Sequence, residues 1–216
     1  MREAILQKIL NQKLIAIVRG LAGGQIVPLA KALLAGGIPL IEVTFDQAEP
    51  DSFVQTARAI MAIREACGEA VSAGAGTVMS PEQLRMAYDA GAGFIISPNV
   101  DEAVIAETRR LGLVSLPGCM TPTECAAAHS YGADFIKIFP AGVLGPEYIK
   151  ALKAPLRHLQ FMAVGGVDPG NIPDFLRAGA VGFGVGGNLV DRELVAAGRF
   201  AEITELAKAY VKACEI

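Results

Sequence analysis

The sequence has few of the residues that bind transition metals. It contains only two histidines, His129 and His158, in 216 residues, and its four cysteines form no C-x-x-C pair. A zinc site usually needs four such ligands at characteristic spacings, and a disulfide framework needs cysteines that can pair. We therefore expect reduced, structural thiols and predict that the protein uses no metal and no cofactor.

An excess of positive charge is also lacking. Lys and Arg total 19 against 22 Asp and Glu, for a formal net charge of -3, and no basic run occurs. Proteins that bind nucleic acids or anionic membranes concentrate Lys and Arg to neutralise phosphates. The composition therefore argues against a nucleic-acid partner.

Long apolar runs are missing as well. Apolar runs such as residues 14–18 are far shorter than the roughly 20 residues that a membrane-spanning helix needs. Residues 1–5 include Arg2 and Glu3 and lack the apolar segment of a signal peptide. We expect a cytoplasmic protein that does not bind membranes.

Glycine, in contrast, is abundant, and it separates a regular alternation of segments. There are 24 glycines, which exceeds the roughly 7% that is average for globular proteins. Short apolar runs alternate with longer amphipathic patterns such as 81–90, 101–111 and 123–131, each ending near a glycine that can cap a helix. The predicted strands are residues 14–19, 40–45, 71–78, 94–98, 114–117, 135–139, 161–164 and 182–185.

Strict alternation of strands and helices predicts parallel strands joined by right-handed crossovers. Eight such units indicate an α/β protein with a (β/α)8 TIM barrel. No linker or change in composition divides the chain, so we predict a single domain over residues 1–216, with an additional N-terminal helix at 3–10 covering the bottom of the barrel. The alternative is a doubly wound sheet, but residues 19–24, RGLAGG, do not match the G-x-G-x-x-G that normally follows its first strand.

Two predicted strands carry a charged residue between apolar neighbours. Lys137 lies in F-I-K-I-F-P, and burial of an amine favours its neutral, nucleophilic form. Glu42 lies in L-I-E-V-T-F, where a period of two places it on one face with Leu40 and Thr44. The pair suits Schiff-base formation by Lys137 and acid–base catalysis by Glu42. The alternatives are a lysine that reaches the surface and a structural ion pair of Glu42 with Lys137 or Arg19.

Other residues are suited to bind anions. Arg19 ends the first predicted strand, where a guanidinium can bind a substrate carboxylate or simply face solvent. The pairs Gly165–Gly166 and Gly186–Gly187 follow the seventh and eighth strands, where TIM barrels commonly bind phosphate through backbone N–H groups. The alternative is that both glycine pairs form plain turns without a ligand. Thr77, in G-A-G-T-V, can offer its N–H and hydroxyl to a carboxylate.

Seven short motifs are distributed along the chain. They are I-E-V-T at 41–44, G-A-G-T-V at 74–78, S-P-N at 97–99, P-G-C-M-T-P-T-E at 117–124, K-I-F-P at 137–140, G-P-E-Y-I-K-A-L at 145–152 and V-G-G-V at 164–167. In this order and spacing they resemble the class I aldolases for 2-keto-3-deoxy-6-phosphogluconate (KDPG) and 4-hydroxy-2-oxoglutarate (KHG). The resemblance covers nearly the whole chain and implies the substrates of that family, which are small molecules.

The resemblance implies an activity and a set of site residues. The reaction is cleavage of 2-dehydro-3-deoxy-6-phosphogluconate to pyruvate and glyceraldehyde 3-phosphate, and also of 4-hydroxy-2-oxoglutarate to pyruvate and glyoxylate. Lys137 would form the Schiff base, and Glu42 would move protons through a bound water. The family usually forms homotrimers and needs no metal. The implied substrate-binding residues are Arg19, Thr77, Pro98 and Val164, and the implied phosphate-binding residues are Gly165, Gly166, Gly186, Gly187 and Asn188.

Three departures from the family pattern bear on the substrate. Asp46 stands where many members have a carboxylate-binding arginine, so that role falls to Arg19 and Thr77. Val164 stands where phosphogluconate aldolases typically have threonine and phosphogalactonate aldolases have valine. A serine often found in the last phosphate loop is replaced by Gly187 and Asn188, so that only backbone N–H groups remain there to bind phosphate.

The alternative substrate is 2-dehydro-3-deoxy-6-phosphogalactonate. Two rival functions also remain: a metal-free phosphosugar isomerase or epimerase, and a non-catalytic barrel that binds a phosphorylated metabolite.

Overall fold

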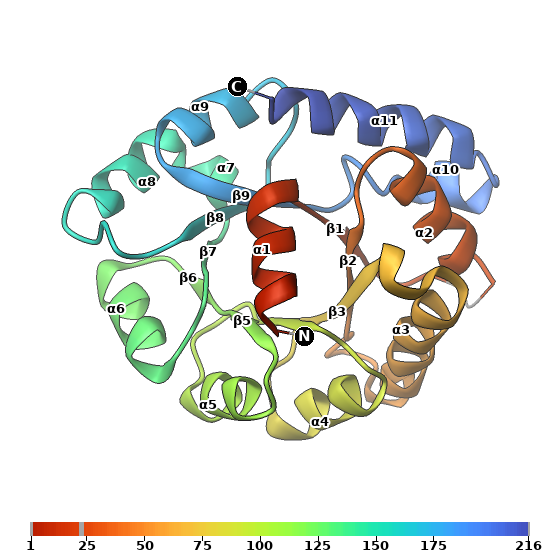
Figure 1. Ribbon diagram of the computed structural model, residues 1–216, viewed down its shortest axis with the longest axis horizontal. Coiled ribbons are helices and arrows are strands. Elements are labelled where there is room, and N and C mark those ends of the chain that lie inside the picture. Colours follow the sequence, from red (N-terminus) through yellow and green to blue (C-terminus); the bar gives the residue numbers. More distant parts are fainter. Residues whose placement is uncertain (1, 22–23, 216) are drawn as a thin grey trace.

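The structure is a computed structural model that describes residues 2–21 and 24–215. Its centre is a ring of parallel strands surrounded by helices (Figure 1). The hydrogen-bonded order is β5-β4-β3-β2-β1-β9-β8-β7-β6. The strands are β1 (Leu14–Val18), β2 (Leu40–Thr44), β3 (Ser72–Gly76), β4 (Phe94–Ile96), β5 (Val114–Leu116), β6 (Gly118–Cys119), β7 (Ile136–Ile138), β8 (Phe161–Val164) and β9 (Ala180–Val185).

The fifth predicted strand, residues 114–117, corresponds to β5, and Pro117 separates β5 from a short further segment, β6, that was not predicted. Proline has no N–H to donate to a strand ladder, and at this residue the chain changes partners. β5 pairs with β4, whereas β6 pairs with β7, and the Pro117 carbonyl accepts the Lys137 N–H at 3.0 Å. The chain itself therefore closes the ring. The predicted (β/α)8 barrel is confirmed, with its eight strands appearing as nine hydrogen-bonded segments.

The helices form the outer layer (Figure 1). The predicted helices at 81–90, 101–111 and 123–131 correspond to α4, α5 and α6, which begin after the side-chain N-caps Ser80, Asp101 and Thr121. The helices are α1 (Arg2–Gln12), α2 (Ile26–Ala35), α3 (Phe53–Cys67), α4 (Pro81–Asp89), α5 (Glu102–Arg110), α6 (Pro122–Tyr131), α7 (Ala141–Leu144), α8 (Pro146–Lys153), α9 (Ile172–Arg177), α10 (Arg192–Ala196) and α11 (Phe200–Ala213), with 3-10 turns at Pro50–Ser52 and Gly68–Ala70.

The lower part of the barrel interior is apolar and is covered by α1, which lies across the ring in Figure 1 as the N-terminal helix prediction requires. Side chains from α1 pack there against side chains from the strands. We call this cluster the floor of the barrel, and we call the opposite end, where the strands end, the mouth. The floor consists of Ile5, Ile9, Ile15, Leu40, Phe94, Ile96, Val114, Leu116, Phe135 and Met162.

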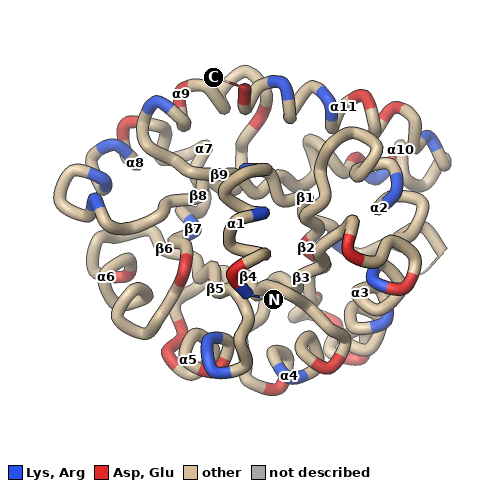
Figure 2. Tube along the Cα trace, viewed as in Figure 1, with Lys and Arg blue, Asp and Glu red and all other residues tan. Residues whose placement is uncertain are grey.

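Alternate residues of each strand face the surrounding helices and form the larger apolar cluster. On β2, Ile41 and Val43 belong to this outer cluster, so Glu42 between them faces the interior. Most charged residues lie on the outer helices, yet Figure 2 shows a basic segment on β7 and an acidic segment on β2 within the ring. Among the described residues, no helix is both long enough and apolar enough to cross a lipid bilayer.

Candidate active site

Lys137 is buried inside the barrel near its mouth. It belongs to β7, and its neighbours Ile136 and Ile138 pack outward. Only 5% of the residue is exposed, and its Nζ donates a hydrogen bond to the Ser97 carbonyl at 3.3 Å. The same Nζ lies 5.0 Å from the centroid of the Phe139 ring. The interpretation of Lys137 as a surface residue is therefore wrong.

Glu42 is 1% exposed, and its carboxylate occupies a space that β3 leaves open. A Cβ at Gly76 would lie 1.6 Å from Glu42 Oε1, so no other residue type fits beside this carboxylate. Glu42 Oε2 has no hydrogen-bond partner among the residues that the structure describes. Unpartnered buried carboxylate oxygens are rare in folded proteins and carry a free-energy cost. An oxygen in this state is available to accept or donate a proton.

Burial and mutual attraction set the protonation of this pair. Burial lowers the pKa of Lys137; the Glu42 charge opposes this shift and the Arg19 charge adds to it. Burial likewise raises the pKa of Glu42, and the positive charges of Lys137 and Arg19 oppose that rise. In the described part of the chain the two groups form no direct salt bridge. Burial thus disfavours the charged form of both groups, and no structural ion pair forms between them.

Arg19 lies at the rim of the barrel and lines a cavity of about 360 Å³ together with Gly186 and Gly187. Gly186 and Gly187 have no left-handed backbone conformation, and an added Cβ at either would meet no atom within 4 Å. The fold itself therefore does not require glycine at these two positions. Their backbone is open toward space that a ligand can enter.

Gly165 and Gly166 differ, because the fold requires both. Their φ angles are +84° and +73°, a region that disfavours side chains. The Gly142 N–H donates to the Gly165 carbonyl at 2.7 Å, and a Cβ at Gly166 would lie 3.0 Å from Gly142 Cα. Neither glycine lines the 360 Å³ cavity. Asn188 joins the two glycine loops, since its Nδ2 donates to the Val167 carbonyl at 3.4 Å.

Thr77, Pro98 and Val164 all lie at the carboxyl ends of strands. Thr77 has a φ of +54°, which is uncommon for a residue with a side chain and is found disproportionately at functional sites. Its carbonyl accepts a hydrogen bond from Gln47 Nε2 at 2.7 Å. Val164 is 6% exposed and faces the interior, where its methyl groups fill the space beside Gly184.

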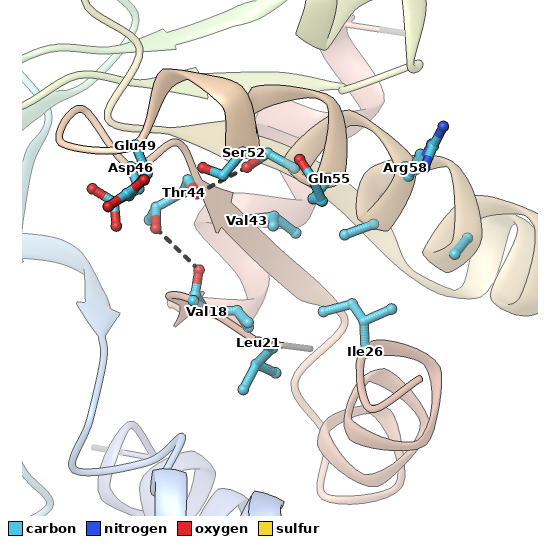
Figure 3. Close-up of a pocket in the computed structure, with 14 residues that line it drawn as sticks. Val18, Leu21, Ile26, Val43, Thr44, Asp46, Glu49, Ser52, Gln55 and Arg58 are labelled. Carbon is cyan, nitrogen blue, oxygen red and sulfur yellow. Dashed lines mark hydrogen bonds between the residues drawn. The ribbon is translucent and has the colours of Figure 1, made fainter. Parts of the chain in front are cut away.

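Asp46 occupies the position where the family resemblance leads one to expect arginine. Its Oδ1 accepts the Ala48 N–H at 3.0 Å, so the side chain caps its own loop. Asp46 lines a larger cavity, of about 590 Å³, on the outside of β1 and β2. Figure 3 shows Asp46 beside Glu49 at one end of this cavity and Arg58 at the other. Neither Lys137 nor Glu42 lines it.

Sequence reasoning missed two groups that position the lysine–carboxylate pair. The Ser97 carbonyl holds Lys137, and Ser97 is itself fixed because its Oγ donates to the Val78 carbonyl at 2.7 Å. Gly76 provides space for Glu42. Ser97 lies in the family motif S-P-N and Gly76 in G-A-G-T-V. These motifs were the only features of the sequence that could have indicated a role for the two residues. Within residues 2–21 and 24–215, no group of three or more His, Cys, Asp or Glu is placed to hold a metal ion.

The fold and the site define a (β/α)8 barrel with a buried lysine–carboxylate pair near its mouth. A family model described as KDPG and KHG aldolase matches residues 5–206. The chain therefore belongs to the KDPG and KHG aldolase family, as its motifs indicate, and is an aldolase by membership.

Individual relatives agree with this assignment. The 2-dehydro-3-deoxy-6-phosphogalactonate aldolase of Escherichia coli (strain K12) is 38% identical over 202 residues, covering 93% of each chain. The 2-dehydro-3-deoxy-phosphogluconate aldolase of Treponema pallidum (strain Nichols) is 36% identical over 183 residues, covering 84% of each chain. The KDPG aldolase of Legionella pneumophila, solved with pyruvate captured at low pH as a covalent carbinolamine intermediate, superimposes with a TM-score of 0.83 at 26% identity, covering 92% of this chain and 94% of that one.

Proposed function

We propose that the protein is a Schiff-base aldolase that cleaves 2-dehydro-3-deoxy-6-phosphogluconate into pyruvate and glyceraldehyde 3-phosphate. One observation carries the proposal: a buried amine, Lys137, lies inside a barrel with a buried carboxyl, and burial lowers its pKa. A neutral amine is the form that attacks a carbonyl. The covalent carbinolamine captured in the Legionella pneumophila relative supports the same chemistry here.

Each step of the reaction uses one of these groups. Lys137 Nζ attacks the C2 carbonyl, and loss of water gives a protonated imine. Glu42, acting through a water, takes the proton of the C4 hydroxyl, the C3–C4 bond breaks, and its electron pair moves toward the imine to give an enamine and the aldehyde. Glu42 then returns the proton to C3, and hydrolysis of the imine releases pyruvate.

The remaining residues hold the two ends of the substrate. Arg19 and Thr77 bind the carboxylate, because Arg19 acts electrostatically on both Lys137 and Glu42 and so lies near the reacting atoms. Pro98 and Val164 pack against the carbon chain. The phosphate is bound by backbone N–H groups of the two glycine loops, for which the open backbone at the second loop gives the strongest support. These phosphate-binding residues are Gly165, Gly166, Gly186, Gly187 and Asn188.

A second candidate substrate, 2-dehydro-3-deoxy-6-phosphogalactonate, differs in configuration at C4. Val164 and the 38% identity to the phosphogalactonate aldolase favour it specifically. Parallel measurements of kcat/KM on both substrates, and on 4-hydroxy-2-oxoglutarate, decide between them. A ratio above about tenfold identifies the substrate, whereas comparable values indicate relaxed selectivity at C4.

Borohydride trapping tests the Schiff base. Incubation with pyruvate and borohydride, followed by intact mass and peptide mapping, is expected to give one reduced pyruvyl adduct on Lys137. Lys150→Ala, which removes an exposed lysine from α8, is the matched control and should trap normally. A folded protein that binds phosphorylated ligands but forms no adduct would disprove the aldolase mechanism and favour a metal-free isomerase or epimerase.

We also propose a cytoplasmic homotrimer. Large apolar side chains are exposed near the mouth, and such patches are typical of subunit interfaces. Val143 is 83% exposed and Phe139 is 41% exposed. Sedimentation equilibrium should give three times the mass of one chain, and Val143→Glu should shift the protein toward monomers. A wild-type monomer at micromolar concentration would contradict the trimer.

A further inference from the structure

The 360 Å³ cavity contains a second arginine that the family resemblance does not assign. Arg192 is the first residue of α10 and lines this cavity with Arg19. Its side chain reaches back toward the end of β1, because a Cβ at Gly20 would lie 3.6 Å from Arg192 Nη2. Among the described residues, neither guanidinium has a carboxylate within salt-bridge distance. Two cations that share a cavity without carboxylate partners favour an anionic ligand there.

Two carboxylates, Asp191 and Glu193, line the same cavity, but neither forms a salt bridge with the arginines in the described part of the chain. Asp191 caps α10, since its Oδ1 accepts the N–H groups of Glu193 at 2.8 Å and Leu194 at 3.0 Å. Glu193 lines the cavity from the exposed face of the helix. Within the described ranges Arg192 therefore has no fixed counter-ion.

The two arginines lie at different distances from the reacting groups. Arg19 directly follows β1, on which Ile17 is the strand partner of Glu42. Arg192 begins α10, beyond the loop that follows β9. Arg19 is therefore the arginine nearer to the reacting groups, and Arg192 lies on the helix side of the cavity. A substrate bound to Lys137 through C2 extends away from that point toward the phosphate on C6.

We propose that Arg192 binds the phosphate of the substrate, beside the open backbone of Gly186 and Gly187, and so determines the preference for phosphorylated substrates. This inference rests on the proposed function. A guanidinium binds phosphate oxygens through two parallel charge-assisted hydrogen bonds. Arg192 thus supplies a side-chain hydrogen-bond donor to the phosphate. It does so next to the loop of Gly187 and Asn188, which lacks the serine that many family members have there.

The test compares a phosphorylated with an unphosphorylated substrate. Arg192→Ala is expected to lower the ratio of kcat/KM for the phospho sugar acid to that for 4-hydroxy-2-oxoglutarate about 10- to 100-fold, mainly through KM, because the variant lacks a hydrogen bond to a charged group. Arg192→Lys should recover part of the ratio. Arg157→Ala, an exposed arginine between α8 and β8 at the floor end, is the matched control for removal of one positive charge. An unchanged ratio in Arg192→Ala would overturn the proposal.

A binding measurement separates this inference from the aldolase proposal. Calorimetric titration with 3-phosphoglycerate needs no turnover, so it remains informative if neither keto acid is cleaved. At least tenfold weaker binding by Arg192→Ala, with normal binding by Arg157→Ala, supports the phosphate role. Equal affinity of the wild type and Arg192→Ala would show that Arg192 does not bind phosphate, whatever the reaction is.

Discussion

The floor and the mouth of the barrel interior are built from the same strands but have opposite chemistry. On β2, Leu40 packs in the floor and Glu42 lies two residues closer to the mouth. Phe135, just before β7, and Lys137 on β7 are related in the same way. A step of two residues keeps the side chain on the interior face and moves it along the barrel. The residues that stabilise the barrel therefore lie in one interior layer, and the residues proposed to react lie in the next layer toward the mouth.

Burial of side chains lowers the free energy of the folded state in the floor but raises it at the lysine–carboxylate pair near the mouth. Each large apolar side chain in the floor contributes about 1.5–3 kcal/mol through burial. Burying an ionisable group costs several kcal/mol per charge unless it is well paired, and Glu42 Oε2 has no partner among the residues described. The floor therefore offsets the cost of the pair near the mouth. Substitutions in the two layers should separate activity from stability.

The largest expected effect comes from Lys137→Ala. Removing the nucleophile should lower kcat at least about 10³-fold, as for other residues that carry a covalent step, while the protein remains folded because a costly buried amine is removed. Pyruvate release measures the first effect and circular dichroism the second. Substantial turnover by this variant would remove Lys137 from the mechanism.

Glu42→Gln should lower kcat by about 10²–10⁴-fold, the usual contribution of a general acid–base. The amide has nearly the same shape but cannot transfer the proton, so the pyruvyl adduct on Lys137 should still be trapped. Steady-state kinetics and mass spectrometry on the same preparation check both statements. An unchanged kcat would assign Glu42 a purely structural role.

Phe135→Ala tests the floor. The side chain is 1% exposed, and its removal should lower the free energy of unfolding by about 3–5 kcal/mol. Because Phe135 lies one interior layer away from Lys137, kcat per folded molecule should change much less than in the mouth variants. Urea unfolding, paired with active-site titration by pyruvate trapping, makes the comparison. A large drop in kcat at normal stability would show that the two layers are not separable.

The sequence predicted the pattern-dependent parts of this arrangement. Period-two alternation placed Glu42 on an interior face, the apolar neighbours of Lys137 predicted its burial, and the order of strands and helices indicated the fold. It could not indicate the Ser97 carbonyl as the Lys137 acceptor, since every residue has a carbonyl. The role of Gly76 depends on contact with another strand. Arg192 resembles any exposed charge on a surface helix until the fold brings it to Arg19.

The smallest expected effect is a pH dependence of stability that distinguishes the layers. Burial lowers the folded-state pKa of Lys137 below its usual 10.5, so between these two values the unfolded chain binds more protons than the native one. The stability of the wild type relative to Lys137→Met should therefore rise as pH increases through this window.

Below the usual pKa of lysine we expect Lys137→Met to be more stable than the wild type, since the variant does not bury an ionisable amine. The Ser97 carbonyl loses its donor, which reduces this gain. Thermal unfolding of both proteins between pH 7 and pH 10.5, with Lys150→Met as the exposed control, measures the difference. A difference that does not vary with pH would mean that burial leaves the lysine as basic in the fold as in the unfolded chain, and the mouth would then lack the neutral nucleophile on which the proposed reaction depends.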